Sequence, residues 1–224
     1  MYEHLFDLSG KVAVVTGAAD GLGKAIALGL AAFGVDIAMA DIDTDRLAQT
    51  VDQVSSLGRK AIGSRCDIGD PQDVAKFFQQ VDNHFSQIDI LVNNAGIIAR
   101  QRPEEITLDD WERVLRVNAT GTFLCSQEAG RRMIARGAGG SIINISSTTS
   151  VSAMGRGNFA YSVSKSAINQ MTRELAVEWA PHNIRVNAIM PAQIRTSYLQ
   201  RLIDDPNFDS DALIKTFLAG IPLD

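Results

Sequence analysis

The strongest constraint on the fold is an alternation of two patterns along the chain. Short runs of apolar and β-branched residues are typical of strands buried in a parallel sheet. They occupy residues 12–16, 37–40, 61–65, 90–93, 142–145 and 185–189. Longer stretches of helical period lie between them, at residues 23–33, 44–57, 71–85, 108–136 and 159–180. This order predicts an α/β fold built from right-handed βαβ units, with helices on both faces of the sheet.

Composition narrows the class of protein. A chain of 224 residues with 46% hydrophobic and 21% charged content can bury one substantial core, so we expect a single domain over residues 1–224. The formal net charge of -5, without clustered Lys and Arg, argues against a nucleic-acid partner. Residues 1–7 carry acidic groups where a secretory signal is basic, and no run of about 18 apolar residues follows. We therefore expect a cytoplasmic protein with no membrane partner.

Cys66 and Cys125 are the two cysteines of the chain. Two cysteines are too few for a disulfide framework, and their spacing does not match that of a zinc site. We expect both to be reduced residues that pack in the interior, and we expect no metal.

A glycine-rich segment directly follows the first predicted strand. It reads Thr16-Gly-Ala-Ala-Asp-Gly-Leu-Gly23, and a helical stretch follows at once. Glycines allow a tight turn and let backbone N–H groups approach a pyrophosphate at the positive end of a helix. Such a turn also occurs in α/β proteins that bind no nucleotide, but the flanking strand and helix favour a dinucleotide. The loop residues expected at the cofactor are Gly17, Asp20, Gly21, Leu22 and Gly23.

Asp41 follows the second predicted strand, 24 residues after Gly17. A carboxylate at this place can accept hydrogen bonds from both hydroxyls of an adenine ribose, and its charge repels a 2′-phosphate. We therefore expect NAD rather than NADP as the cofactor. Asp41 can also begin the turn to the next helix, which Asp43 or Thr44 would cap. The two interpretations are compatible.

Three further motifs follow in order. They are Asn93-Asn-Ala-Gly96, Ile145-Ser-Ser147, and Tyr161 with Lys165 four residues later. With the T-G-x-x-x-G-x-G loop, they make the chain resemble the short-chain dehydrogenase/reductase family over nearly its whole length. The resemblance implies a doubly wound Rossmann sheet in three layers, normally of seven strands, assembled as a dimer or homotetramer. Six strands are predicted here, and relatives continue past residue 224 into another helix and the seventh strand.

The resemblance also implies the remaining cofactor contacts. Asp67 and Ile68 would lie beside the adenine, and Asn94, Ala95 and Gly96 would line the cofactor-binding cleft. At the other end of the cofactor, Pro191, Ile194 and Thr196 would contact the nicotinamide, and Tyr161 and Lys165 would contact its ribose. The sequence reads Pro191-Ala192 where the family most often has Pro-Gly, so it carries an extra methyl group at a point where the family's backbone shape relies on glycine. The asparagine pair has a structural alternative, because amides at a strand end can bond to the backbone of neighbouring loops.

Tyr161 and Lys165 supply the chemistry that the family implies. Hydride transfer at a carbonyl carbon requires an acid or base within hydrogen-bond reach of the oxygen, and Tyr161 is the candidate. Moving a phenol pKa about three units towards neutrality requires roughly 4 kcal/mol of stabilisation of the phenolate. Lys165 lies on the same helix face at i+4, so we expect its ammonium to favour the phenolate. The alternative is an exposed Tyr and Lys on a solvated helix face.

Ser147 and Asn118 are the expected supporting residues. Ser147 would hydrogen-bond the substrate oxygen, as the second serine of its motif does in the family. It stands 14 residues before Tyr161 where 13 is commoner, and 13 would give Thr148, which also bears a hydroxyl. Asn118 matches the family's helix asparagine, which helps a water chain relay protons to Lys165. Its alternative is a helix-interior amide that bonds to the backbone.

The substrate is expected from the segment after the asparagine motif. Ile97-Ile-Ala-Arg-Gln-Arg-Pro103 resembles the sugar-acid and polyol branch of the family, which includes gluconate dehydrogenases. Arg100 and Arg102 beside a cleft can clamp a carboxylate, while Ser147 and Tyr161 hold the reacting oxygen. Two solvated loop charges are the alternative. In the family, residues from about 195 to 224 form the substrate lid, which we expect here as well.

The sequence thus predicts an NAD-dependent oxidoreductase that interconverts a secondary alcohol and a ketone on a sugar acid or polyol. Two alternatives stay open. One is a regulatory Rossmann protein that binds NAD without turnover, and the other is a dehydrogenase for a steroid or acyl substrate. An epimerase or dehydratase of this fold usually has a longer chain with a larger substrate domain.

Overall fold

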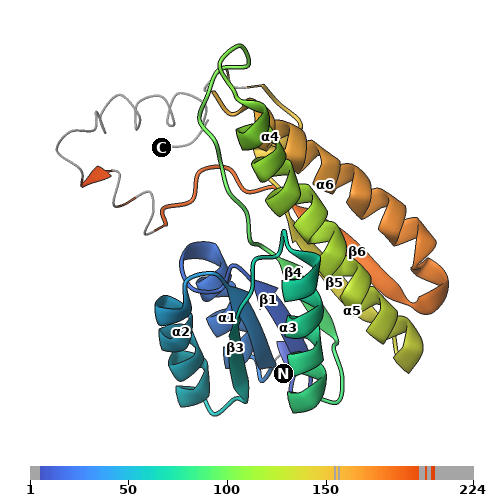
Figure 1. Ribbon diagram of the computed structural model, residues 1–224. Coiled ribbons are helices and arrows are strands. Elements are labelled where there is room, and N and C mark those ends of the chain that lie inside the picture. The colour runs from blue at the N-terminus through green and yellow to red at the C-terminus, as the bar shows by residue number, and fades with distance from the viewer. Residues whose placement is uncertain (1–5, 154, 156, 197–199, 201–202, 205–224) are drawn as a thin grey trace.

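The computed structural model describes residues 6–153, 155, 157–196, 200 and 203–204. Within these residues, six strands form one sheet with the order β3-β2-β1-β4-β5-β6. The strands are β1 (Val12–Thr16), β2 (Asp36–Asp41), β3 (Ala61–Arg65), β4 (Ile90–Asn93), β5 (Gly140–Ile145) and β6 (Ile184–Ile189). Every neighbouring pair is parallel. The predicted doubly wound parallel sheet is therefore confirmed (Figure 1).

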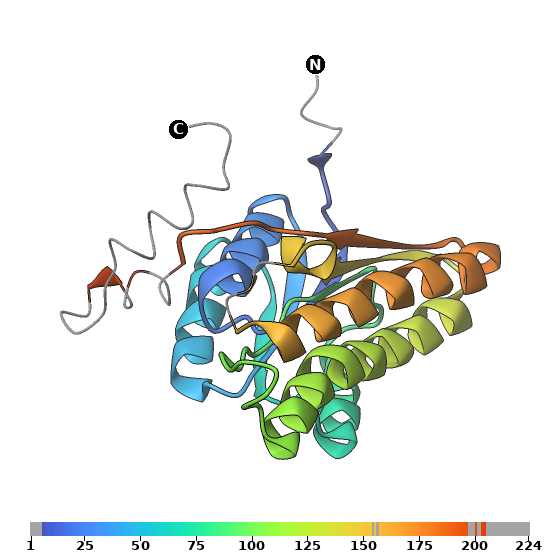
Figure 2. The same ribbon diagram turned by 90° about the horizontal axis from the view of Figure 1, so that it is seen from above.

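Helices cover both faces of the sheet and make the molecule a three-layer sandwich. They are α1 (Gly21–Ala32), α2 (Thr44–Ser56), α3 (Pro71–His84), α4 (Leu108–Leu115), α5 (Thr122–Arg136) and α6 (Phe159–Glu178). Seen from above, α1 and α2 lie on one side of the sheet, while α3, α5 and α6 lie on the other (Figure 2).

The core consists of two apolar layers separated by the sheet. Successive side chains of a strand point to opposite faces. In β1, Val14 packs with Phe77 and Phe78 of α3, whereas Val15 packs in the layer that contains Ala27 and Ala31 of α1. Both faces of the central strands are thus buried, which explains why their sequences are apolar throughout rather than alternating.

The strand order fixes where a ligand can bind. From β1 the sheet is extended by β2 and β3 on one side, and then by β4, β5 and β6 on the other side of β1. The direction in which strands are added therefore reverses between β1 and β4. In open parallel sheets, ligands bind in the crevice beyond the carboxyl ends of the strands at this reversal. Thr16, Asp41, Asn93 and Ile145 end four of these strands and lie at that edge.

The helical stretch predicted at 108–136 is one continuous run with an irregular centre. Residues Arg116–Gly121 form a π turn, called η2, between α4 and α5. Val114 and Met133 are both fully buried and stand 19 residues apart, whereas five regular α turns take about 18 residues. The π turn accommodates the extra residue, and such turns are frequent at functional sites.

The other predicted boundaries differ from the observed ones by one or two residues at the ends. The predicted strands at 37–40, 142–145 and 185–189 are slightly longer in the structure, and the first helix begins at Gly21 rather than residue 23. The predicted substrate lid at 195–224 falls outside the described residues except for 195–196, 200 and 203–204. The described residues contain six strands and no seventh.

Candidate active site

The glycine loop connects β1 to α1 in a conformation that side chains would not allow. Gly17 has φ of +66°, and a Cβ there would lie 2.8 Å from the Cα of Ala95. Gly23 packs so closely that a Cβ would collide with the carbonyl oxygen of Gly17. Asp20 caps the helix, because its Oδ1 accepts a hydrogen bond of 2.7 Å from the Gly21 N–H. The loop therefore presents bare backbone at the positive end of α1, as a pyrophosphate requires.

A cavity of about 600 Å³ begins at this loop and runs across the carboxyl ends of the strands. Ten residues predicted to contact the cofactor line it: Gly17, Asp20, Gly21, Asp41, Asp67, Ile68, Asn94, Ala95, Gly96 and Thr196. Gly23 does not line it and acts through the close packing just described. The bare glycine backbone, with the carboxylate of Asp41 directly beside it, fits the pyrophosphate and the adjoining ribose of a dinucleotide.

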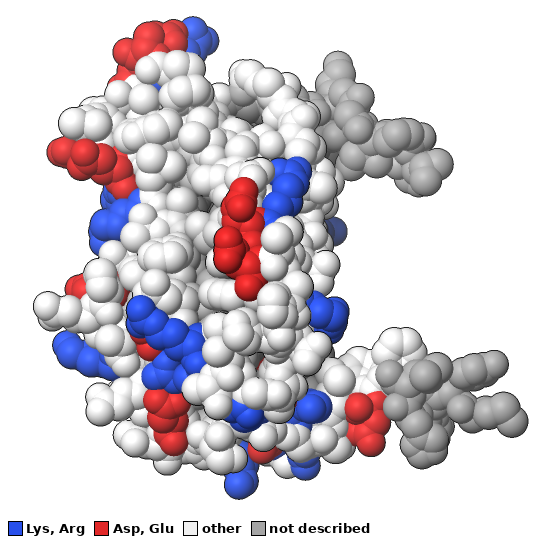
Figure 3. All heavy atoms as spheres, turned by 90° about the vertical axis from the view of Figure 1, so that its right-hand side faces the viewer, with Lys and Arg blue, Asp and Glu red and all other residues white. Residues whose placement is uncertain are grey.

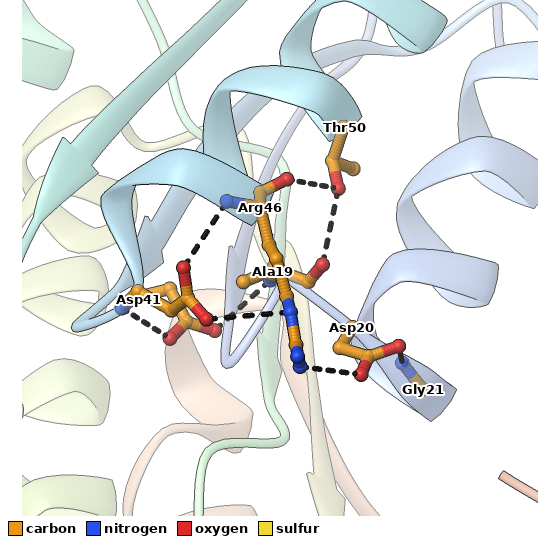
Figure 4. Close-up of polar contacts among 7 residues, drawn as sticks. Ala19, Asp20, Gly21, Asp41, Arg46 and Thr50 are labelled. Atoms are coloured by element: carbon orange, nitrogen blue, oxygen red, sulfur yellow. Dashed lines mark hydrogen bonds and ion pairs between the residues drawn. The ribbon is translucent and has the colours of Figure 1, made fainter. Parts of the chain in front are cut away.

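Asp41 is held in place by the backbone of two loops. One carboxylate oxygen accepts the N–H of Ala19 at 2.9 Å, and the other accepts the N–H of Asp43 at 3.0 Å (Figure 4). A carboxylate has about four acceptor sites, so each oxygen keeps one for a ligand. The turn-forming role is thus present while acceptor sites for a ligand are retained, and Asp43 is the cap of α2.

The asparagine pair has the structural role that we considered as its alternative. Asn94 Nδ2 donates to the carbonyl oxygens of Thr16 at 3.1 Å and Gly17 at 3.0 Å, which ties β4 to the glycine loop. Asn93 is buried and donates to Asn144 on β5 at 2.9 Å. The pair therefore braces the wall of the cavity on which Ala95 and Gly96 lie.

A second cavity of about 290 Å³ adjoins the first, and the two share Asn94, Gly96 and Thr196. Predicted residues that line it are Leu22, Arg100, Ser147, Tyr161, Lys165, Pro191 and Ile194. The residues expected at the nicotinamide and those expected to act on the substrate thus meet in one place. Both arginines are exposed, but only Arg100 borders this cavity, and Arg102 is not among its lining residues.

Tyr161 and Lys165 extend from the first turns of α6 into this second cavity. Lys165 is only 4% exposed, so the alternative of a solvated helix face is wrong. Its Nζ donates to the carbonyl oxygen of Ile145 at 2.6 Å and lies 5.6 Å from the centre of the Tyr161 ring. Burial lowers the pKa of Lys165 to about 8.

The pKa of Tyr161 differs from the expectation. Burial raises the pKa of its phenol, and a hydrogen bond with Ser147 opposes that rise in part. The direction is opposite to the one predicted from the spacing to Lys165, because the surroundings of the phenol remove it from water. Spacing reveals which groups share a helix face, but it does not reveal how deeply they are buried.

Ser147 rather than Thr148 lines the second cavity. The Ser147 Oγ accepts two hydrogen bonds from Thr149, one from its backbone N–H at 3.2 Å and one from its hydroxyl at 3.0 Å. A hydroxyl has two acceptor lone pairs and one hydrogen to donate. With both lone pairs occupied, Ser147 has only its hydrogen left for Tyr161 or a substrate oxygen. No sequence motif marks Thr149, so its contact with Ser147 could not be predicted.

Asn118 lies in the π turn and is fully buried. Its Oδ1 accepts the N–H of Ile97 at 2.8 Å, and its Nδ2 donates to the carbonyl oxygen of Ile97 and the hydroxyl of Ser164, both at 2.9 Å. The Ser164 hydroxyl donates in turn to the carbonyl oxygen of Tyr161 at 2.7 Å. The amide therefore joins the loop after β4 to the helix that carries Tyr161.

The two cysteines are free thiols in the apolar layer beneath α3 and α5, as expected. Burial raises the pKa of Cys66 to about 12 and also raises the pKa of Cys125. Among the described residues, no cluster of His, Cys, Asp and Glu has the geometry of a metal site. No helix in the described part of the chain is long and apolar enough to span a membrane.

Comparisons with known proteins agree with the geometry. The family model described as short chain dehydrogenase matches residues 11–207. The 2-dehydro-3-deoxy-D-gluconate 5-dehydrogenase of Escherichia coli (strain K12) is 40% identical over 221 residues, which cover 98% of this chain and 86% of that enzyme. The NAD-dependent glycerol dehydrogenase of Listeria innocua serovar 6a is 39% identical over 191 residues, covering 85% of this chain and 73% of that enzyme.

Among solved structures, a short-chain type dehydrogenase/reductase from Mycobacterium marinum superposes with a TM-score of 0.87 at 38% identity. The alignment covers 91% of this chain and 81% of that structure. These similarities confirm the resemblance to the sugar-acid and polyol branch. Because a family match extends over most of its length, the chain belongs to the short-chain dehydrogenase/reductase family and is an oxidoreductase.

Proposed function

We propose that the protein is an NAD-dependent dehydrogenase that interconverts a secondary alcohol and a ketone on a sugar acid or polyol. The observation that carries the proposal is the continuity of the two cavities. Ser147, Tyr161 and Lys165 line one of them, and Asp41 and the glycine loop line the other. A dinucleotide that spans both would bring its nicotinamide to the tyrosine.

Each residue of the second cavity has a distinct part in the proposed reaction. The bound nicotinamide supplies the hydride acceptor or donor. Tyr161 takes the alcohol proton during oxidation and returns it during reduction. Ser147 donates its hydrogen to the substrate oxygen, where negative charge develops. Lys165 would hold the nicotinamide ribose and, as a cation, favour ionisation of the phenol.

Two observations support NAD over NADP. Asp41 presents a fixed negative charge where the adenine ribose would lie, and a 2′-phosphate there would meet a like charge. The glycerol dehydrogenase of Listeria innocua, a relative at 39% identity, carries NAD dependence in its name. Titration of the protein with NADH and NADPH tests the proposal, and equal affinity for the two would overturn it.

Replacing Tyr161 by Phe tests the chemistry. We expect Tyr161→Phe to lower kcat by about 10²–10⁴-fold, because the variant keeps the ring but has no proton to transfer. Its affinity for NADH should remain that of the wild type. The measurement is NADH absorbance during a screen of aldonates, polyols, steroids and acyl substrates. Wild-type NADH binding without turnover of any substrate would instead favour a regulatory protein.

Arg100 supports the acidic substrate class. It borders the second cavity together with Ser147 and Tyr161, and its guanidinium can pair with a carboxylate in two hydrogen bonds. We expect Arg100→Gln to lower kcat/KM for D-gluconate by about tenfold or more, since a charge-assisted bond contributes about 1.5–3 kcal/mol. The rate with sorbitol, a neutral polyol, should change little.

Arg102→Gln is the matched control for that experiment, because Arg102 is exposed and two residues away in the same loop. It should leave kcat/KM for both compounds unchanged. Equal losses for D-gluconate and sorbitol in Arg100→Gln would contradict a role in binding the carboxylate.

We also propose that the protein assembles into a dimer or tetramer. On the side of the molecule that carries α5 and α6, groups of charged side chains are separated by uncharged surface (Figure 3). These helices expose Phe123, Val163 and Val177, with 42%, 37% and 75% of their surface accessible. Large apolar side chains exposed on adjacent helices are typical of an interface between subunits. Sedimentation equilibrium gives the assembly mass, and a monomer at micromolar concentration would refute the proposal.

A further inference from the structure

The adenine-ribose end of the first cavity holds one arginine among three carboxylates. Asp20, Asp41, Asp43 and Arg46 all line that cavity. Arg46 Nη1 lies 3.0 Å from Asp20 Oδ2, and Arg46 Nε lies 3.5 Å from Asp43 Oδ2. In Figure 4 the Arg46 side chain extends from α2 to the labelled Asp20. We call Asp20, Arg46 and Asp43 the Arg46 clamp.

Both carboxylates of the clamp are fixed before they meet the guanidinium. Asp20 uses Oδ1 to cap α1 through the Gly21 N–H at 2.7 Å, and Asp43 uses Oδ1 to cap α2 through the Arg46 N–H at 3.1 Å. Each therefore has its second oxygen aimed at Arg46. Because the caps already hold the two carboxylates, closing the clamp requires little further loss of side-chain freedom.

The clamp decides which charge a ligand meets at this end of the cavity. An unclamped arginine is well suited to a phosphate, because its planar fork can donate two parallel hydrogen bonds. Here Nη1 and Nε already face carboxylates. With the carboxylate of Asp41 beside them, the four side chains carry a net charge of −2 (three Asp and one Arg). The wall thus repels a dianionic 2′-phosphate, although it contains an arginine.

We propose that the Arg46 clamp is a second determinant of cofactor selection, which prevents Arg46 from binding the 2′-phosphate of NADP. The inference rests on the proposed preference for NAD. It differs from the role of Asp41, because Asp41 would bond to the ribose hydroxyls, whereas the clamp withholds a cation. Loss of the clamp alone should therefore improve NADP binding relative to NAD binding.

The test replaces Asp20 by Asn in the full chain. Asn keeps an oxygen that can cap α1 at Gly21 but loses the charge that holds Arg46. We expect the Kd for NADPH, measured by fluorescence titration, to fall by about tenfold, as one charge-assisted bond to a phosphate provides. The readout is the ratio of the Kd for NADPH to the Kd for NADH, because Asp20 also lines the cofactor cavity and caps α1. This ratio should fall by about tenfold. Thermal unfolding verifies that the variant is folded.

Two further variants separate release of Arg46 from simple removal of charge. Asp45→Asn removes one negative charge from the same turn of α2, and Asp45 is exposed and makes no ion pair with any described residue. It should leave the NADPH affinity unchanged. In an Arg46→Gln background, Asp20→Asn should no longer tighten NADPH binding.

The outcomes distinguish this inference from the proposed function. If the wild type binds NADPH as tightly as NADH, the proposed NAD preference is wrong, and the proposed role of the clamp in excluding NADP is wrong with it. If the wild type prefers NADH but Asp20→Asn leaves the Kd for NADPH unchanged, only the clamp is refuted. If Asp20→Asn tightens NADPH binding equally in the Arg46→Gln background, the role of the clamp is also refuted, because Asp20 would then act by repelling the 2′-phosphate and not by holding Arg46.

Discussion

Thr149 shows how a single residue outside every motif can direct the chemistry of one inside a motif. Its backbone N–H and hydroxyl occupy both lone pairs of Ser147. Thr149 is itself only 8% exposed, so water competes little for these bonds. Ser147 is therefore oriented as a donor, which is the role that stabilisation of a developing oxyanion requires.

We expect Thr149→Val to lower kcat by about three- to tenfold, because one hydrogen bond of about 0.5–1.5 kcal/mol to Ser147 is lost. The backbone N–H bond and the side-chain shape are retained, so the NADH affinity should not change. Thr149→Ser restores the hydroxyl and should recover most of kcat. Stopped-flow measurement of hydride transfer follows the step directly, and an unaffected rate in Thr149→Val would show that Ser147 needs no such orientation.

The sequence predicts the candidate pair, Tyr161 and Lys165, but not the surroundings of these two side chains. Tyr161 and Lys165 are recognisable because i,i+4 spacing places two side chains on one helix face. The direction of the Tyr161 pKa could not be predicted in the same way, since it depends on burial by segments distant in sequence. The partners of Asn118 were equally hidden, because Ile97 and Ser164 come from two other parts of the chain.

At the scale of elements, the strand, glycine loop and first helix form a unit whose geometry depends on close backbone contact. A Cβ on Gly23 would collide with the carbonyl oxygen of Gly17, and it would also lie 2.5 Å from the Asn94 Nδ2. Asn94 Nδ2 is the group that ties β4 to this loop. A substitution at Gly23 therefore moves α1 and disturbs two strands at once.

We expect Gly23→Ala to destabilise the protein by about 1–3 kcal/mol, as overpacking typically does, and to weaken NADH binding by at least about tenfold. Urea unfolding and NADH titration measure the two effects. Gly29→Ala, on the same helix, is the matched control because a Cβ there meets nothing within 4 Å. It should stabilise the protein by about 0.5–1 kcal/mol through helix propensity. Similar effects of the two substitutions would contradict the packing argument.

The elements themselves were predictable because their patterns are local. Apolar runs and helical periods located six strands and the helices between them, since each pattern reflects one buried face. The π turn at Arg116–Gly121 was not predicted. Residues 108–136 have the polarity pattern of a single helix, and one extra residue within five turns is too small a drift to recognise without the sheet that the helix packs against.

At the scale of the whole molecule, the burial of the charged Lys165 side chain lowers the free energy of unfolding at neutral pH. Lys165 is 4% exposed, and burial lowers its pKa from 10.5 to about 8. A difference of this size corresponds to roughly 3 kcal/mol of folding free energy lost at neutral pH. The unfolded chain binds the proton more tightly than the folded one, so this loss is complete below pH 8 and disappears as the pH rises from about 8 to 10.5.

We therefore expect Lys165→Met to be more stable than the wild type by roughly 1–2 kcal/mol at pH 7 while being inactive, because the carbonyl of Ile145 loses its donor and offsets part of the gain. The advantage should shrink as the pH rises above about 8. Urea unfolding between pH 7 and 10 measures it. The exposed Lys76→Met should show no such pH dependence. A variant less stable than the wild type at pH 7 would mean that the ammonium is well solvated or paired.

Because of the π turn, the number of residues between α4 and α5 matters more to the structure than which residues they are. Val114 and Asn118 precede or lie within it, whereas Cys125, Ala129 and Met133 follow it, and all five are fully buried. Deleting one residue from the turn would restore a regular α-helix and rotate everything beyond it by about 100°. Either the Asn118 amide would leave the site or the three later side chains would leave the sheet. In this helix, the candidate active site and the hydrophobic core depend on the same number of residues.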